Sequence, residues 1–384
     1  MKNSHTYIPV VIVGGGPVGL FLAICLLKKG IQCKILEKRD EPVPDSRSLG
    51  IHPVSLELFD KIDLTQPFLD QGLKIQKGFA LSSDKVLGEI NFEGCPKPHN
   101  YILACPQFTS EAILREELNR LDDSVLVTKA EFNELKQKEG QVEIYFTDEQ
   151  GNNRFITADY VIGCDGKNSP VRQRSSIHYS GKRYDDTYIM GDFEDNTDFG
   201  SDAAVYLPPD GLIECFPLPN GMRRWVVKTD SYVENPDSTI IVEFIRKRIN
   251  HDLTAIQNVM ISSFGVQHFI AETFVKGRVI LAGDAAHVVS PIGGQGMNLG
   301  WLDAWRVAEI LSGDDIDLNL KEYSKSQKKI TRKVAKRAEL NMALGRKTVI
   351  PSIRNLFIKS LLKKPLKNKI AQLFTMRGLE SWWI

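Results

Sequence analysis

The sequence has little of what marks a disulfide-rich, metal-binding or membrane-spanning chain. Its six cysteines form no C-x-x-C pair and its seven histidines no H-x-x-x-H pair, so neither a disulfide framework nor a zinc site is indicated. The most apolar early stretch, residues 8–27, is interrupted by Gly14, Gly15, Gly16, Pro17 and Gly19, and it lacks a charged leader and a cleavage site. We therefore expect neither a signal peptide nor a membrane span, but a cytoplasmic protein with reduced thiols and no metal.

The composition is that of a folded protein with an uneven charge distribution. Hydrophobic residues make up 42% and charged residues 25%, which excludes a disordered or collagenous chain. The formal net charge is only +1, but residues 321–377 contain 17 Lys and Arg against Glu322 and Glu339. That segment carries +15 and the remainder −14, so we expect an acidic body with a basic C-terminal region.

The opening of the chain reads as a βαβ unit. A β-branched run at 10–13 precedes a glycine-rich turn, an apolar helix over 18–29 and a second strand over 33–36. A further block from 108 to 165 predicts a helix, a hairpin over 141–155 and a strand over 160–164. We expect this block, including its hairpin, to extend the same doubly wound layer.

The pattern of apolar and turn-forming residues changes between about 176 and 270. Short alternating runs separated by Pro-Pro-Asp-Gly and Pro-Asn-Gly turns predict an antiparallel sheet, and the α/β pattern returns over 278–311. We therefore expect an α/β fold with a doubly wound, mainly parallel, Rossmann-like dinucleotide-binding domain (1–75, 100–175 and 270–320). An inserted antiparallel-sheet substrate domain (76–99 and 176–269) and a basic helical C-terminal region (321–384) complete the prediction.

Three strand-to-loop junctions carry the chemistry. Gly14-x-Gly16-x-x-Gly19 lies between a strand and a helix, with Glu37 at the end of the next strand. Glycines there allow a tight turn and close approach of the backbone to a pyrophosphate, and an acid at 37 suits an unphosphorylated adenosine ribose. This favours FAD or NAD over NADP at this site.

Two later junctions favour FAD. Asp165-Gly166 follows one strand, and Gly283-Asp284 follows another, ahead of a Gly-rich turn and a new helix. A helix N-terminus at that turn can stabilise negative charge on a reduced flavin ring, and Asp284 can accept hydrogen bonds from a ribityl chain.

With these motifs in this order, the chain resembles the class A flavin-dependent aromatic monooxygenases, which have the para-hydroxybenzoate hydroxylase fold. Residues 46–57, S-R-x-x-G-I-H-P-x-x-L-E, are similar to the pattern of phenol and aromatic-polyketide hydroxylases. Many larger members carry a thioredoxin-like C-terminal domain, for which this chain is too short. The resemblance implies contacts of an FAD-binding domain from Gly14, Gly16, Pro17, Val18, Gly19, Glu37, Lys38, Arg47, Gln107, Asp165, Gly166, Arg172, Gly283, Asp284, Pro291, Gly294, Gly296, Met297 and Asn298.

The activity that the resemblance implies is aromatic hydroxylation. NAD(P)H, a transient co-substrate, reduces FAD; O2 then gives a flavin C4a-hydroperoxide that transfers oxygen to a phenolic or polyketide-like ring. Alternatives on the same fold are a prenyl-chain reductase and a flavin-dependent halogenase, although the W-x-W-x-I-P halogenase signature does not match the sequence around Trp225. A flavoprotein that docks to a partner is an alternative of another class. No nucleic-acid partner is expected.

Single residues on the substrate side are harder to assign. The resemblance places Pro291 beside both flavin and substrate. Tyr206, Glu214, Arg223 and Trp225 lie on the predicted substrate sheet, where alternation sends half of the side chains inward but does not reveal which half. We take Pro291, Arg223 and Tyr206 as catalytic candidates. His287, near a carboxylate at a strand end, is more simply structural.

The C-terminal region admits two interpretations. Ile353, Leu356, Phe357 and Leu361 recur at helical spacing among lysines and arginines. The favoured interpretation is that this stripe packs over the flavin domain while the cations form a solvated face. The alternative is that the region attracts an anionic membrane surface, giving a peripheral membrane protein, or an acidic carrier protein.

Overall fold

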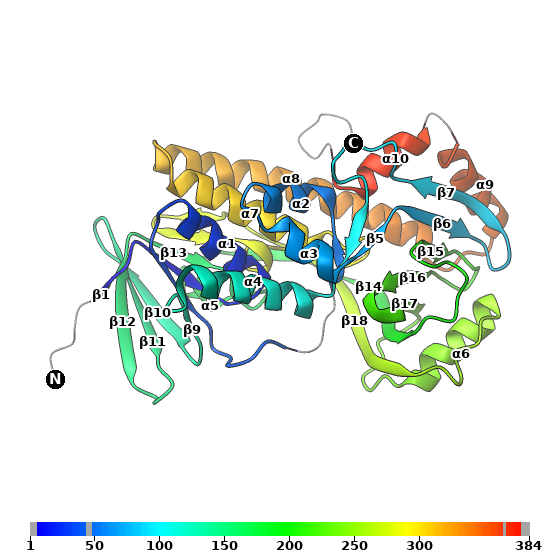
Figure 1. The fold of residues 1–384 in the computed structure, drawn as a ribbon, viewed down its shortest axis with the longest axis horizontal. Coiled ribbons are helices and arrows are strands. Elements are labelled where there is room, and N and C mark those ends of the chain that lie inside the picture. The colour runs from blue at the N-terminus through cyan, green and yellow to red at the C-terminus, as the bar shows by residue number, and fades with distance from the viewer. Residues whose placement is uncertain (1–5, 44–47, 364–365, 378–384) are drawn as a thin grey trace.

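The computed structural model describes residues 6–43, 48–363 and 366–377. A parallel sheet wrapped by helices lies beside an antiparallel sheet, and one long helix, α8, runs along both (Figure 1). Among the described residues, no helix is both long and apolar enough to cross a membrane. The predicted α/β class with a mainly parallel, doubly wound sheet is confirmed.

The parallel sheet positions the cofactor loops. Its strand order is β19-β20-β13-β2-β3-β9, and every neighbouring pair is parallel except the edge pair β19 and β20. Its strands are β2 (Val10–Val13), β3 (Cys33–Leu36), β9 (Leu126–Val127), β13 (Tyr160–Gly163), β19 (Val275–Lys276) and β20 (Val279–Leu281). The helices of this domain are α1 (Pro17–Lys28), α2 (Pro53–Asp60), α3 (Thr65–Gln71), α4 (Gln107–Asp122), α5 (Pro170–Arg174) and α7 (Gly296–Leu311), with the short helix η2 (Gly283–Ala285) after β20.

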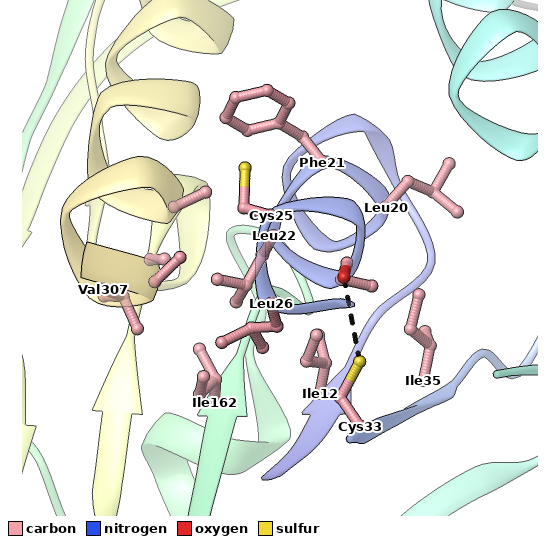
Figure 2. Packing of buried hydrophobic residues seen from close by; sticks show 14 of the residues in the cluster. Ile12, Leu20, Phe21, Leu22, Cys25, Leu26, Cys33, Ile35, Ile162 and Val307 are labelled. Carbon is pink, nitrogen blue, oxygen red and sulfur yellow. Dashed lines mark hydrogen bonds between the residues drawn. The ribbon is translucent and has the colours of Figure 1, made fainter. Parts of the chain in front are cut away.

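Helix α1 is buried on all sides, in keeping with its uniformly apolar sequence. Every residue from Leu20 to Leu26 is fully buried. In Figure 2 its side chains lie between Ile12, Ile35 and Ile162 of the sheet and Val307 of α7. The helix begins with Pro17, whose missing N–H costs nothing at that position, and ends before Gly30, which has a φ of +77°.

The hairpin predicted over 141–155 forms, but its assignment to the doubly wound layer is wrong. It belongs to a separate sheet of order β1-β12-β11-β10. Its alternating burial in β11 explains this, because only one face is covered, whereas a strand in a helix-covered parallel sheet is buried on both. The strands are β1 (Thr6–Tyr7), β10 (Glu131–Gln137), β11 (Val142–Thr147) and β12 (Asn153–Ala158).

The antiparallel body is an eight-stranded sheet of order β21-β18-β14-β17-β16-β15-β6-β7, in which only β15 and β6 are parallel. Its strands are β6 (Lys77–Leu81), β7 (Val86–Asn91), β14 (Tyr179–Glu194), β15 (Ala203–Tyr206), β16 (Ile213–Leu218), β17 (Met222–Thr229), β18 (Asn258–Ala271) and β21 (His287–Val288), with η1 (Pro219–Gly221) between β16 and β17. A separate three-stranded sheet consists of β4 (Gly50–Ile51), β8 (Ile102–Ala104) and β5 (Leu73–Ile75), in that order. One face of the large sheet is covered by α6 (Ser238–Ile249), a helix absent from the sequence prediction.

Three helices end the described chain: α8 (Ile316–Gly345), α9 (Pro351–Leu361) and α10 (Leu366–Phe374). The expectation that the apolar stripe of α9 packs over the flavin domain is wrong. α9 lies beside β7 of the eight-stranded sheet, where Ile358 is buried, while Ile353, Leu356 and Phe357 are exposed (Figure 1). The stripe that faces inward is therefore offset from the predicted one, with Ile358 and Leu362 as its contacts.

Candidate functional site

The loops that carry the sequence motifs gather at one edge of the parallel sheet. The glycine turn follows β2, Glu37 follows β3, Asp165 follows β13 and Asp284 follows β20. Because these four strands are parallel neighbours, their carboxyl ends lie at the same edge. Four segments spread between residues 14 and 284 of the sequence are thus brought together for one extended ligand.

The glycine turn is tight because its neighbours leave no room for side chains. A Cβ at Gly14, which has a φ of +107°, would lie 2.4 Å from the Cys164 carbonyl oxygen, and one at Gly19 would lie 2.0 Å from the Gly14 oxygen. At Gly16, by contrast, a Cβ would meet nothing within 4 Å. Among the described residues no side chain caps the N-terminus of α1, so its free N–H groups face open space suited to a phosphate.

Of the other predicted contacts, Glu37 lies against this turn. The buried Glu37 carboxylate accepts hydrogen bonds from the backbone N–H of Gly15 at 2.6 Å and of Arg39 at 2.9 Å. It therefore holds the glycine turn in place. Gln107 begins α4 and donates to Glu111 at 2.8 Å. Lys38 is exposed. The predicted contact Arg47 lies outside the described residues.

The Asp165 loop is tied to the Asp284 loop by Arg172. This buried guanidinium donates to the backbone oxygens of Lys167 and Ala285, both at 2.8 Å, and its carbon lies 3.7 Å from the centroid of the Tyr179 ring. One oxygen of Asp165 accepts from the Val171 N–H at 2.9 Å, while the other is buried and has no hydrogen-bond partner among the described residues. Burial raises the pKa of this carboxyl. Arg172 therefore sets the spacing between two cofactor loops, and its predicted contact with the cofactor stays a prediction.

A buried carboxylate that the sequence analysis missed holds the turn after β20. Asp303 of α7, which is fully buried, accepts hydrogen bonds from the Gly283 N–H at 2.9 Å, from His287 Nε2 at 2.6 Å and from Gln327 Nε2 at 2.6 Å. Burial alone would lower the pKa of His287, but Asp303 outweighs it and raises that pKa. His287 thus has a buried partner on α7, which supports its interpretation as a structural residue.

Asp284 follows Gly283 directly in the chain. Its side chain is exposed to solvent, yet the surrounding protein desolvates the carboxyl enough to raise its pKa, against the opposing effect of His287 and Lys167. No group in the part of the chain that the structure describes donates a hydrogen bond to this carboxyl, as is expected where a ligand's hydroxyl groups supply the hydrogen bonds.

The loop over 290–295 leads into α7 and is held by hydrogen bonds to Asn298 and His52. The buried Asn298 amide donates to the backbone oxygens of Gly50 and Gly294 and accepts from the His52 N–H and the Ser55 hydroxyl. His52 Nε2 lies 3.1 Å from the Gly293 oxygen, and burial lowers the pKa of this histidine to about 4, so the ring is neutral. Gly294 has a φ of +65° and Met297 packs on the main core. Pro291 is exposed at the start of the loop.

The strand pairing shows which side chains of the eight-stranded sheet lie on the same face, which alternation in the sequence could not. Glu214 pairs with Val205 and Val226, and Val226 pairs with Met190; Val226 and Met190 pack in one cluster with Ile292 of the 290–295 loop and Met342 of α8. We call this side of the sheet the loop face. Tyr206 and Trp225 lie on the opposite face, against α6.

Arg223 also lies on the α6 face, where it is fully buried. Its guanidinium donates to the backbone oxygens of Gly200 and Asp202 and pairs with Asp195 at 2.9 Å. The geometry therefore brings Pro291 and Glu214 toward the loop face and places Tyr206 and Arg223 behind the sheet. We do not carry Tyr206 and Arg223 forward as catalytic candidates.

The residues present suit FAD. An uncapped helix N-terminus with an open approach at Gly16 offers donors for a pyrophosphate, Glu37 offers an acceptor near the adenosine ribose, and Asp284 offers a desolvated acceptor for a polyol chain. The N-terminus of α7 is likewise uncapped among the described residues. All three lie at one sheet edge, so a single extended dinucleotide reaches them.

Comparison with known proteins agrees with this geometry. The model of the family described as "FAD binding domain" matches residues 7–338. The chain is 31% identical over 315 residues to an uncharacterized aromatic compound monooxygenase of Bacillus subtilis and to a rifampicin monooxygenase of Streptomyces venezuelae, covering 79% of this chain in both cases. It spans 62% and 64% of those relatives, somewhat less than two thirds of their length.

Solved structures show the same fold. The p-nitrophenol 4-monooxygenase of Pseudomonas putida superimposes with a TM-score of 0.88 at 22% identity, covering 99% of this chain and all of that one. An anhydrotetracycline hydroxylase from Streptomyces rimosus gives a TM-score of 0.80 at 26% identity, covering 97% of this chain and 76% of that one. The expected FAD-binding fold is thus confirmed over nearly the whole chain.

Replacing Asp284 with Ala should weaken FAD binding about tenfold or more. The change removes a charged acceptor, and hydrogen bonds to charged groups contribute roughly 1.5–3 kcal/mol each. Equilibrium titration of apoprotein with FAD measures the effect, with the exposed Asp123→Ala as a control that loses the same charge away from the site. Wild-type affinity in Asp284→Ala would show that this carboxylate does not bind the cofactor.

Replacing Asp303 with Asn should destabilise the fold by roughly 3–5 kcal/mol, because it breaks a buried charge pair and leaves a donor unmatched. The His287 share of the stabilisation is present below the ordinary histidine pKa and is lost as pH rises through the raised pKa. Urea unfolding at several pH values measures both. Glu309→Gln, on the exposed side of α7 and paired with Lys29, is the control and should cost less than about 1 kcal/mol. Equal effects would contradict the role of Asp303.

Proposed function

The chain belongs to the FAD binding domain family, and from that premise we propose that it is an FAD-dependent monooxygenase that uses NAD(P)H and O2 to hydroxylate an aromatic substrate. The observation that carries the proposal is the convergence of Glu37, the glycine turn and Asp284 at one sheet edge, opposite the loop face of a large antiparallel sheet. Such an arrangement holds a dinucleotide in one domain and leaves a second domain to receive a substrate.

The division of labour between cofactor and protein follows from these residues. FAD, when bound, supplies the redox chemistry that takes a hydride from NAD(P)H and activates O2. The N-terminus of α1 orients the pyrophosphate, Asp284 fixes the polyol chain, and the uncapped N-terminus of α7 favours negative charge near the 290–295 loop. The apolar loop face, with Met190, Val226 and Ile292, keeps water from that region.

We propose a phenolic or polyketide-like ring as the substrate class. The relatives and neighbours described above are named for an aromatic compound, rifampicin, p-nitrophenol and anhydrotetracycline, which differ widely in size. Measuring NAD(P)H oxidation by the FAD-loaded protein with and without a panel of phenols tests the proposal. Substrate-stimulated oxidation with an oxygenated product supports it, and oxidation that no phenol stimulates contradicts it.

Replacing Pro291 with Ser should uncouple oxidation from hydroxylation. Pro291 restricts the backbone at the start of the 290–295 loop, and a misplacement of about 1 Å in a reacting group can cost roughly 100-fold in rate. The expected result is NAD(P)H consumption with hydrogen peroxide released and little hydroxylated product. Pro236→Ser, ahead of α6, is the control. Tight coupling in Pro291→Ser would count against a placing role for this loop.

We further propose that α9 docks the protein to an anionic membrane surface. Val349, two residues before α9, and Ile353, Leu356 and Phe357 on α9 have exposed fractions of 95%, 64%, 67% and 48%, which is unusual for large apolar residues clustered in one short segment. Residues 346–377 contain nine Lys and Arg and no acidic residue. A second copy of this surface would repel the first, whereas an anionic surface complements both the charge and the apolar side chains.

The double variant Leu356→Ser, Phe357→Ser should lose at least tenfold in binding to vesicles that contain phosphatidylserine, because each buried apolar side chain contributes roughly 1.5–3 kcal/mol. Wild-type binding should weaken as salt rises. Flotation at low and high salt measures this, with Val259→Ser, an exposed apolar residue of β18, as control. Absence of wild-type binding at low salt, or binding only to an acidic carrier protein, would overturn the membrane proposal.

A further inference from the structure

Glu214 is an unmatched buried carboxylate on the loop face. It is 8% exposed, and no hydrogen bond or ion pair to its side chain is found within the part of the chain that the structure describes. Its row across the sheet runs from Val205 through Glu214, Val226 and Met190 to Ser262. A buried charge in such apolar surroundings is costly unless something pairs with it.

The cations on the same face are already paired. Arg224 makes two hydrogen bonds to Asp192, of 2.6 and 2.7 Å, in the neighbouring row. Lys228 lies 3.3 Å from Asp186 on the other side. The elements packed against this face carry charged groups of their own. Glu339 and Arg346, on α8 and at its end, pair with Lys182 and Asp186 respectively, and Arg354 of α9 donates to backbone oxygens of Leu207 and Pro208. α8 also carries the buried Arg337. The 290–295 loop has no titratable residue.

Tyr188 supplies a second polar group without a partner. It lies on the loop face in the row next to Met190, is 1% exposed, and its ring stacks on Phe264 with centroids 5.3 Å apart. Its hydroxyl is buried and makes no hydrogen bond to any residue that the structure describes. Met190 shares a row with Glu214, and Tyr188 is two residues before Met190 on β14, so both polar groups lie in adjacent rows of the same face. Tyr188 can therefore donate where Glu214 can accept.

We propose that Glu214 and Tyr188 recognise a neutral hydroxyl group on the aromatic substrate, with the Glu214 carboxylate accepting the hydrogen bond that this hydroxyl donates and the Tyr188 hydroxyl donating to its oxygen. The inference rests on the proposed function. It makes the site selective for neutral phenols over aromatic carboxylates, because a second carboxylate beside Glu214 would be repelled in a poorly hydrated environment.

The same pair predicts how binding depends on pH. Burial raises the pKa of Glu214 to about 7, so the accepting, ionised form increases between pH 6 and pH 8. A hydroxyl-bearing ring should bind more tightly over that interval. A ring with no hydroxyl donor should show no such change, since it gives Glu214 nothing to accept.

Three probes with one ring system separate the contributions: 2-naphthol, its methyl ether 2-methoxynaphthalene, and 2-naphthoate. Their dissociation constants for the FAD-loaded protein are measured by equilibrium dialysis at pH 6 and pH 8. Wild type should prefer 2-naphthol. Glu214→Gln should weaken 2-naphthol about tenfold at pH 8, tighten 2-naphthoate and leave the methyl ether unchanged, whereas Tyr188→Phe should weaken both 2-naphthol and the ether.

Glu243→Gln on the exposed side of α6 is the matched control and should bind all three probes as wild type does. Thermal unfolding at pH 8 checks folding: Glu214→Gln should melt no lower than wild type, because it removes an unpaired buried charge. A marked loss of stability would reveal an internal partner for Glu214 and overturn the proposal. So would a wild type that prefers 2-naphthoate or binds no probe, or equal shifts for all probes in Glu214→Gln.

Product analysis distinguishes this proposal from the proposed function. Binding that follows the expected pattern without any oxygenated product would leave the recognition role standing and overturn the monooxygenase. Oxygenated product formed by a protein whose binding ignores Glu214 and Tyr188 would overturn the recognition role alone.

Discussion

The close approach of α1 to its neighbours is the constraint on which the rest of the cofactor site depends. A Cβ at Gly19 would meet the Gly14 oxygen at 2.0 Å, and one at Gly300 of α7 would meet the Val18 side chain at 2.4 Å. Because the helix packs on the glycine turn and on α7 with no room for a side chain at these glycines, its uncapped N-terminus is aimed at the same edge as the turn after β20. A single larger side chain at these contacts would separate the phosphate site from the polyol site.

Local patterns predicted the elements around this helix well, because each of them obeys a short-range rule. The β-branched run at 10–13, Pro17 at the first helical turn and Gly30 beyond the last one all specify the βαβ unit without reference to distant residues. The hairpin over 141–155 was predicted in form but assigned to the wrong sheet, since alternation reveals a half-buried strand and not its partner. Helix α6 could have been predicted from its N-cap, because the Asp237 carboxylate accepts from the backbone N–H groups of Thr239 and Ile240. The interpretation of this region as alternating strands missed that signal.

Side-chain roles that depend on pairing across long sequence separations could not be predicted. Alternation within a strand does not fix the register between β15 and β16, and it is the observed pairing of Val205 with Glu214 that puts Glu214 and Tyr206 on opposite faces. The packing of Ile292 and Met342 against one face then shows which of them looks toward the cofactor loops. The role of Asp303 is similar, because nothing in the sequence of α7 marks one carboxylate as the acceptor for Gly283 and His287. The motif glycines were visible in the sequence; the groups that hold their loops in place were not.

The separation between the cofactor edge and the loop face depends on one helix, α8. In its first half, Tyr323 donates to the Leu281 oxygen at 2.9 Å and Gln327 to Asp303 at 2.6 Å, which ties it to the turn after β20. At its end, the Gly345 oxygen accepts from the Leu212 N–H at 2.8 Å, two residues before Glu214. A 30-residue helix spans about 45 Å as a stiff rod, so the two domains keep a fixed spacing. Hydrogen bonds at both ends of one rod therefore set how far the Glu214 carboxylate stands from the 290–295 loop, and a hinge between the sheets would have to break them.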